Sequence, residues 1–308
     1  MKKDFVSIID LDREELESLI TEARRLKTLK QEGTLHELLP GRNLAMIFEK
    51  ASTRTRVSFE VGMTDLGGHA LFLNPHDMQL GRGEEIRDTA RVLSRYVDAV
   101  MIRAYHHETI EEFARYSTVP VINGLSDRLH PCQVLSDILT MREHFTSLEG
   151  LRLAWIGDGN NVCNSLILAS ALTGMEIAVA SPPGYQPKDD IVEMARKAGG
   201  HVSIGSDPMV AAQDADILYT DIWVSMGDEP ERAARLRAFS GYTIDTALVR
   251  HASPDAIVMH CLPAHRGEEI TGEVLESPQS IVWDQAENRL HAQKALLARL
   301  IGGSRQEQ

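Results

Sequence analysis

A run of hydroxyl and guanidinium side chains, Ser52-Thr53-Arg54-Thr55-Arg56, is the segment of this sequence best suited to hold a phosphate. It stands between an apolar run and a stretch with helical periodicity, so a helix is expected to begin there. Free backbone N–H groups at a helix start, hydroxyls and guanidinium forks together suit an anion. The ordinary alternative is a capped helix whose arginines are solvated surface charges.

Further polar residues follow other short apolar runs. They include Glu49, Lys50, Arg103, His106, His107, Asn123, Asp127, His130, Gln133, Asp158, Asn160, Asn161, Asp221, Ser225, Met226, Cys261, His265 and Arg266. In open α/β sheets, ligands bind outside the carboxyl ends of the strands. These side chains are therefore expected to form one site, provided that the strand ends all face the same cleft.

The segment Gly157-Asp158-Gly159 invites comparison with a dinucleotide-binding turn. The third glycine of that fingerprint would stand at position 162, which is Val162, and no acidic residue follows the next apolar run, which ends at Ala180 and Ser181. A tight turn between a strand and a helix is the preferred interpretation. A dinucleotide-linked dehydrogenase is accordingly disfavoured.

Histidines near cysteines raise the question of a metal or of a nucleophilic thiol. Adjacent His260 and Cys261, and His130 near Cys132, lack the spacing of a metal motif, so no metal is expected. Cys261 would need a base and an orienting group to act as a nucleophile, and a buried, inert cysteine is the alternative. The three cysteines contain no Cys-x-x-Cys pair, which fits a reducing compartment.

The segment Ser225-Met226-Gly227-Asp228 is predicted to be a loop, and a methionine is unusual there. Met226 could fill an irregular gap if the loop folds inward. Alternatively, a backbone N–H beside a flexible apolar side chain could line a small ligand. The residues alone leave both interpretations open.

The elements that must position these residues alternate between short strands and amphipathic helices. Strands are expected at residues 44–48, 70–73, 99–102, 119–122, 151–156, 176–180, 201–204, 217–220, 256–260 and 281–283. Most are continuous apolar runs, as in strands that are covered on both faces. The first helix has Asp12 and Glu15 placed like a capping box. The pattern predicts an α/β protein with two doubly wound, mostly parallel sheets.

Ten strands are too many for one small sheet, so two domains are expected. Residues 1–130 would hold four strands and residues 150–285 would hold six. A helix over residues 130–144 would join the domains, and a last helix over residues 285–301 would pack back on the first domain.

Bulk composition limits the classes of partner. The chain has 308 residues, 43% of them hydrophobic, and a formal net charge of −13. An acidic protein repels a phosphate backbone, so nucleic acid is not an expected partner. The most apolar stretch, residues 166–175, is too short to cross a bilayer. The N-terminal residues lack the pattern of a signal peptide. We therefore expect a cytoplasmic protein with no membrane partner.

Five collinear motifs make this sequence resemble the ornithine carbamoyltransferase family along essentially its whole length. They are Ser52-Thr53-Arg54-Thr55-Arg56, His130-Pro131-Cys132-Gln133, Asp158-Gly159-Asn160-Asn161-Val162-Cys163-Asn164-Ser165, Asp221-x-Trp223-x-Ser225-Met226-Gly227 and His260-Cys261-Leu262-Pro263. The first two mark the wider carbamoyltransferase superfamily. The last two point to ornithine rather than aspartate as the acceptor.

The resemblance implies two α/β domains, a homotrimer, no metal or organic cofactor, and a place in arginine biosynthesis. The implied carbamoyl phosphate ligands are Ser52, Thr53, Arg54, Thr55, Gln79, Arg103, His130, Gln133, Cys261, Leu262 and Arg289. The implied ornithine ligands are Asn161, Asp221, Ser225 and Met226. Gln79 would reach into a neighbouring subunit. Some relatives carry a lysine where this chain has Gly83, beside Arg82, and this departure puts that loop charge in doubt.

The implied chemistry is a direct transfer. Arg103 and His130 would donate hydrogen bonds to the carbonyl oxygen, as an oxyanion hole does. Asp221 and Cys261 would orient the acceptor amine and help it to lose a proton. Direct transfer needs no acyl-enzyme, so Cys261 is expected to position the amine rather than to attack carbon.

Two further alternatives remain beside the dehydrogenase. One is a carbamoyltransferase with another acceptor, such as putrescine or an acylated ornithine, which Ser225-Met226-Gly227 disfavours because those acceptors lack groups that this loop would read. The other is a non-catalytic, ornithine-sensing protein of the same fold. Binding alone would not need Arg103, His130 and Cys261 together.

Overall fold

The structure, a computed structural model, describes residues 3–79, 83–224 and 229–302. The chain forms two compact units, one of Met1–Leu139 with Glu287–Gln308 and one of Thr140–Ala286. The boundaries lie inside helix α5 (Pro131–His144) and helix α12 (Val282–Gly302). Each of these two helices therefore contributes residues to both units. The assignment of a substrate to each predicted domain stays a prediction.

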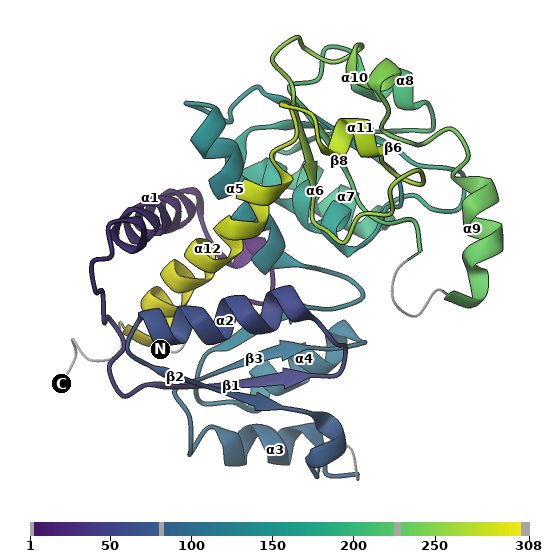
Figure 1. Cartoon of the computed structure of the whole chain (residues 1–308). Helices are drawn as coiled ribbons and strands as arrows, with labels where there is room; N and C mark the ends of the chain where they lie inside the picture. The colour runs from purple at the N-terminus through teal and green to yellow at the C-terminus, as the bar shows by residue number, and fades with distance from the viewer. Residues whose placement is uncertain (1–2, 80–82, 225–228, 303–308) are drawn as a thin grey trace. The chain divides into compact units, whose positions relative to one another are not determined.

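The first unit is built on a four-stranded sheet in which every pair of neighbours is parallel, in the order β2-β1-β3-β4. Its strands are β1 (Asn43–Phe48), β2 (His69–Leu73), β3 (Ala99–Arg103) and β4 (Val121–Leu125). Its helices before α5 are η1 (Ile8–Asp10), α1 (Arg13–Gln31), α2 (Thr53–Asp65), η2 (Pro75–Asp77), α3 (Ile86–Leu93) and α4 (His107–Tyr116). Helices α2 and α3 lie on opposite faces of this sheet (Figure 1).

The order of the first sheet places a topological switch point between β1 and β3. From β1 the chain crosses to β2 on one side, and it then returns to form β3 on the other side. Crevices at such points bind ligands, because the loops that follow the two strands separate there. The run that begins at Ser52 follows β1, and Arg103 ends β3.

The second unit holds a five-stranded sheet of parallel pairs in the order β7-β6-β5-β8-β9. Its strands are β5 (Arg152–Ile156), β6 (Glu176–Ala180), β7 (His201–Gly205), β8 (Ile217–Thr220) and β9 (Ile257–His260). Its helices are α6 (Asn161–Thr173), α7 (Asp189–Lys197), α8 (Pro208–Ala212), η4 (Glu229–Glu231), α9 (Arg232–Ala238), α10 (Thr246–Val249) and α11 (Gly272–Leu275). The switch point lies between β5 and β8, by the same reasoning.

Local signals in the sequence explain where several helices begin. Asp12 caps α1 and accepts a hydrogen bond from Glu15 N–H, while the Glu15 carboxylate accepts one from Asp12 N–H, which confirms the predicted capping box. Helix α6 is buried along nearly its whole length and ends at Gly174, whose φ of 74° is the left-handed conformation that glycine adopts without strain.

Helix α12 packs within the first unit through buried polar contacts. The Lys294 side chain is fully buried and lies 3.3 Å from Asp65 of α2. Burial lowers the pKa of Lys294, and Asp65 partly offsets that effect. A Cβ atom built on Gly62 would lie 3.4 Å from Lys294, an ordinary van der Waals contact, so α2 and α12 pack directly against each other here.

Three sequence predictions about the strands need correction. Residues 281–283 were expected to form a strand, but α12 begins at Val282. The described residues therefore contain nine strands, four in one sheet and five in the other, instead of ten. Most strands were expected to be covered on both faces, but most residues of the edge strands β2 and β7 are exposed. The other strands begin and end within two residues of their predicted bounds, apart from β4, which ends three residues later.

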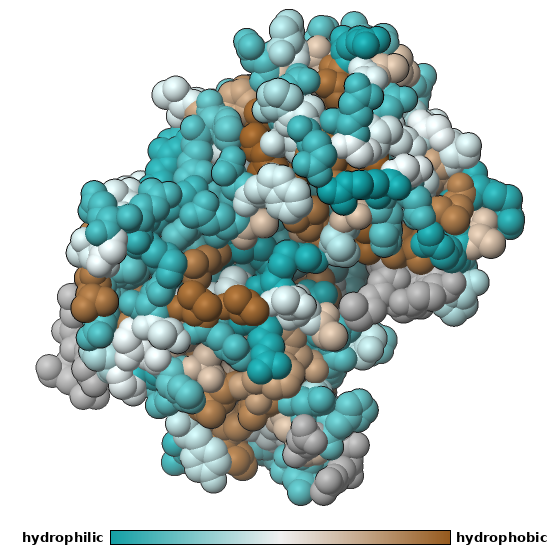
Figure 2. Space-filling view, viewed as in Figure 1, coloured by the Kyte–Doolittle hydropathy of each residue, from teal (hydrophilic) through white to brown (hydrophobic). Residues whose placement is uncertain are grey.

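The exposed apolar residues on the face seen in Figure 2 lie in separate groups among hydrophilic side chains. Apolar atoms contribute a large share of the surface of most globular proteins. Among the described residues, no helix combines the length and the apolar character needed to cross a membrane.

Candidate active site

The turn after β1 forms the expected start of a helix. Ser52 is the N-cap of α2, and its hydroxyl accepts a hydrogen bond of 3.2 Å from Thr55 N–H. Thr53 is exposed at the first helical position, Arg54 is half-buried, and Thr55 is fully buried. The Thr55 hydroxyl accepts a hydrogen bond of 2.8 Å from Arg289 of α12. Hydroxyl, guanidinium and helix-start groups thus meet at the switch point of the first sheet.

The charges of three guanidinium groups act on His130. Its side chain is buried just before α5. Burial lowers the pKa of His130 well below its usual value of 6.5, and the positive charges of Arg289, Arg103 and Arg54 lower it further, in that order. The imidazole is therefore neutral at pH 7, and it keeps one N–H donor. The charges of Arg54, Arg103 and Arg289 thus all act on His130, and the predicted role of these four residues as carbamoyl phosphate ligands stays a prediction.

Gln133 adds a buried amide to the first unit. Only 1% of this residue is exposed, and its amide nitrogen donates a hydrogen bond of 2.9 Å to Asp137 one turn along α5. That bond fixes the amide so that its oxygen, Oε1, is the free end, and Oε1 has no hydrogen-bond partner among the described residues. Buried acceptors are normally satisfied, so Oε1 is suited to receive an N–H donor from a ligand.

Gln79 stands apart from this cluster in the described structure. Its side chain is exposed in the segment that follows η2, and its carbonyl oxygen accepts a hydrogen bond from Glu84 N–H. Nearby Arg82 lies outside the described residues, while Gly83 adopts a φ of 97°. The predicted role of Gln79 in a neighbouring subunit's site stays a prediction.

In the second unit, the segments after β5 and β8 are joined by Asp221. One carboxylate oxygen of Asp221 accepts a hydrogen bond of 2.7 Å from the Asn160 side chain, and the other accepts one of 2.8 Å from Ile222 N–H. Asn160 is also the N-cap of α6, which leaves Asn161, half-buried, as the first residue of that helix. Asp221 is thus fixed at the switch point of the second sheet.

The segment after β9 presents Cys261 and Leu262, and both are half-buried. Leu262 has a φ of 58°, a left-handed conformation that is costly for a branched side chain. Its N–H donates a hydrogen bond of 2.9 Å to Nδ1 of His260, which compensates for that cost. The Nδ1 atom therefore accepts, so the ring proton is on Nε2, which lies 3.1 Å from the buried carboxylate of Glu269.

Two groups of side chains have metal-ligand atoms close together. Those of Asp221, His260 and Cys261 lie within 4.8 Å of one another, and so do those of His265, Glu268 and Glu269. In the first group both ring nitrogens of His260 already form hydrogen bonds within the protein, so this histidine is not available as a ligand. The expectation that the protein uses no metal stays a prediction.

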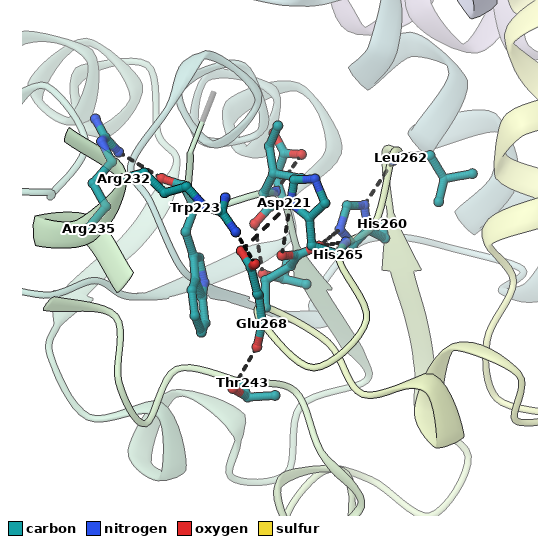
Figure 3. A network of polar contacts seen from close by, with 12 residues as sticks. Asp221, Trp223, Arg232, Arg235, Thr243, His260, Leu262, His265 and Glu268 are labelled. Carbon is teal, nitrogen blue, oxygen red and sulfur yellow. Dashed lines mark hydrogen bonds and ion pairs between the residues drawn. The ribbon is translucent and has the colours of Figure 1, made fainter. Parts of the chain in front are cut away.

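Sequence reasoning missed the residues that support this site. Asn160 was noted as a polar residue after a strand and as part of a family motif, but without a role, yet it holds Asp221, and Glu269 holds His260. Both follow strands of the second sheet, but their partners are 61 and 9 positions away. Figure 3 shows Asp221, His260 and Leu262 in this network. Two predicted ligands, Ser225 and Met226, lie outside the described residues.

Comparison with known proteins identifies the family. A family model for the carbamoyl-P binding domain of aspartate/ornithine carbamoyltransferases matches residues 3–143, and a model for their Asp/Orn binding domain matches residues 149–300. A protein of Methanoculleus marisnigri named ornithine carbamoyltransferase is 75% identical over 98% of both chains. The chain belongs to the ornithine carbamoyltransferase family. The resemblance read from the five motifs is therefore confirmed.

Solved structures of family members have the same fold. The structure of the Pyrococcus furiosus ornithine carbamoyltransferase matches with a TM-score of 0.94 at 51% identity, covering 98% of both chains. That of Thermus thermophilus matches with a TM-score of 0.88 at 42% identity, covering 98% of this chain and 99% of the other. The predicted fold class, α/β with two parallel sheets, is confirmed.

Proposed function

We propose that this protein transfers the carbamoyl group of carbamoyl phosphate to the side-chain amine of L-ornithine, giving L-citrulline and phosphate. Besides family membership, one observation supports this most directly. His130 is buried after β4, and the charges of Arg289, Arg103 and Arg54 help to lower its pKa well below its usual value. Guanidinium groups suit a doubly charged acyl phosphate, and a neutral imidazole still offers one N–H donor to a carbonyl oxygen.

The first unit supplies the groups for carbamoyl phosphate. Ser52, Thr53, Arg54, Thr55 and Arg289 would surround the phosphate, since hydroxyl and guanidinium donors match its oxygens. The acceptor atom Oε1 of Gln133 has no hydrogen-bond partner among the described residues and suits the amide N–H of the carbamoyl group. Arg103 and His130 would donate to the carbonyl oxygen, where negative charge develops during attack.

The transfer itself conserves atoms and charge without a covalent enzyme intermediate. The amine nitrogen of ornithine forms a bond to the carbonyl carbon. The bond from that carbon to the phosphate oxygen then breaks, and its electron pair stays on the phosphate. The ammonium group of ornithine first gives one proton to solvent, and the departing phosphate takes up the second proton, which the nitrogen loses after the attack.

The second unit supplies the groups for the acceptor. A lysine-like amine has a pKa of about 10.4, so ornithine arrives protonated and must lose a proton before it can attack. Asp221 and Cys261 would orient this amine, because their ligand-type atoms lie within 4.8 Å of each other. Asn161, Ser225 and Met226 would bind the α-amino and α-carboxylate groups, and Leu262 would line the reacting end.

We propose a homotrimer in which Gln79 completes the site of a neighbouring subunit. A reducing cytoplasmic location agrees with three free cysteines, two of them buried. A role in arginine biosynthesis agrees with the name of a Pyrococcus furiosus relative, "Ornithine carbamoyltransferase, anabolic", which is 52% identical and matches 98% of this chain and 97% of its own length.

The test is product identification with the purified protein. Incubation with carbamoyl phosphate and L-ornithine should yield citrulline and phosphate in equal amounts, measured by mass spectrometry and a phosphate assay. A reaction without ornithine corrects for spontaneous hydrolysis of carbamoyl phosphate. Phosphate release without citrulline would show a hydrolase and would contradict the proposal.

A further inference from the structure

A buried arginine outside the predicted ligand set joins two segments of the second unit. Arg235 lies on α9, and only 12% of its side chain is exposed. One nitrogen, Nη1, lies 2.9 Å from the Asp158 carboxylate and 2.9 Å from the carbonyl oxygen of Trp223, and donates to both. The guanidinium also lies 5.0 Å from the ring centre of Tyr185.

These contacts connect the segments on either side of the switch point. Asp158 belongs to the turn after β5, and Trp223 belongs to the segment after β8. The bond from Asn160 to Asp221 joins the same two segments. Arg235 is therefore a second connection, parallel to the one that holds the Asp221 carboxylate. Figure 3 shows Arg235, Trp223 and Asp221 in one view of this network.

The same helix contacts Trp223 through its apolar side as well. The Trp223 indole stacks on Phe239, with ring centres 5.5 Å apart and an angle of 15° between the planes. Phe239 is the C-cap residue of α9 and is fully buried. Polar and apolar contacts together hold the Trp223 backbone, two residues after Asp221, against α9.

We infer that Arg235 is a positioning residue for the acceptor amino acid, acting through Asp158 and Trp223 to fix Asp221 and the start of α6. This inference rests on the proposed function. The Asp158 carboxylate is also 12% exposed, so the ion pair is shielded from water and its charge-assisted hydrogen bond is strong. Small displacements of substrate-positioning groups reduce turnover disproportionately, because reacting atoms must lie at near-bonding distance.

The test compares steady-state kinetics of Arg235→Gln with those of the wild-type protein. The KM for ornithine should rise about tenfold or more, with a smaller change in kcat, because the lost contact acts on acceptor binding. The affinity for carbamoyl phosphate, measured without ornithine, should stay within a factor of about two, since its predicted phosphate ligands lie in the other unit. Arg235→Lys keeps the charge but not the planar fork, and should restore part of the ornithine affinity.

Arg237→Gln on the same helix is the matched control. Arg237 is exposed, and its replacement should leave the KM for ornithine unchanged. The double variant Arg235→Gln with Asp158→Asn leaves no unpaired buried charge, and circular dichroism checks that it folds. If that folded variant bound ornithine as the wild type does, the inference would be overturned. If the wild-type protein itself formed no citrulline, the proposed function would fail instead.

Discussion

Arg289 Nη2 donates a hydrogen bond of 2.8 Å to the hydroxyl of Thr55, from a position 234 residues further along the chain. Both side chains are buried, with Thr55 fully covered and Arg289 4% exposed. A bond to a charged donor in a dry environment is stronger than one at the surface. The last helix therefore fixes the first turn of α2, where several of the predicted phosphate ligands lie.

Arg54→Ala should weaken the binding of carbamoyl phosphate. Arg54 is a predicted phosphate ligand near the start of α2, so its loss would leave phosphate charge without a partner. A hydrogen bond to a charged group contributes about 1.5–3 kcal/mol, which corresponds to about a tenfold to hundredfold loss of affinity. Isothermal titration calorimetry measures the change directly.

Arg56→Ala is the control for that measurement, because Arg56 lies on the same helix but its side chain is 46% exposed and pairs with Glu60 at 2.9 Å. This variant should bind carbamoyl phosphate as the wild type does. Equal affinities for the folded Arg54→Ala variant and the wild type would remove Arg54 from the phosphate site.

His130 should make the folded protein less stable in acid. Its pKa is lowered in the folded state, so at acid pH the unfolded chain binds a proton that the folded chain does not. The free energy of unfolding should therefore fall as the pH drops below about 6.5, the ordinary histidine pKa, and this contribution should vanish above it. Urea unfolding between about pH 5 and 8 measures the slope.

His130→Gln removes the titrating group and keeps a buried amide. Its unfolding free energy should depend less steeply on pH than that of the wild type in the same interval. Parallel curves for the two proteins would mean that His130 has an ordinary pKa in the folded state.

Cys261 should affect the acceptor amine without carrying the carbamoyl group. Cys261→Ser retains a small hydrogen-bonding group and should keep measurable turnover with an altered KM for ornithine or an altered pH dependence, while Cys261→Ala should lose more. Intact-protein mass spectrometry with carbamoyl phosphate alone should show no added mass. A carbamoylated Cys261 that reacts on addition of ornithine would establish the covalent mechanism instead.

The trimer proposal predicts complementation between two inactive variants. A Gln79→Ala variant and an Arg103→Ala variant, unfolded together and refolded as a mixture, should recover part of the wild-type activity. Some interfaces would then pair an intact Gln79 with an intact Arg103 from a neighbour, as cyclic symmetry allows. Each variant refolded alone is the control. A fully active monomer in analytical ultracentrifugation would contradict composite sites.

Much of this architecture could be predicted because local patterns agree with the fold. Asp12 and Glu15 specify where α1 begins, and apolar runs mark the covered strands β1, β3, β5 and β8. The expected strand at residues 281–283 was wrong because a short apolar run does not distinguish a strand from a buried helix start. Val282 is fully buried, but it begins α12.

The residues that support the predicted ligands could not be found from the sequence, because their roles depend on tertiary contacts. Arg235 lies 77 positions from Asp158, and nothing in the local sequence distinguishes it from exposed Arg237 on the same helix. Likewise, the local sequence does not distinguish Glu269 from its neighbour Glu268, although only Glu269 is fully buried and contacts His260. Motif spacing identified the groups expected to touch substrate, while the residues that hold them depend on folded contacts.

The central claim is that the acceptor is ornithine, and the specificity constants for several amines test it most directly. Initial rates of carbamoyl transfer should be measured at fixed carbamoyl phosphate with L-ornithine, N-acetylornithine, putrescine and L-aspartate. The kcat/KM for ornithine should exceed that for every other amine by about a hundredfold or more, because a site built for two α-substituents is left with unpaired polar groups when either is missing or blocked. A kcat/KM for putrescine, N-acetylornithine or aspartate equal to or above that for ornithine would contradict the account.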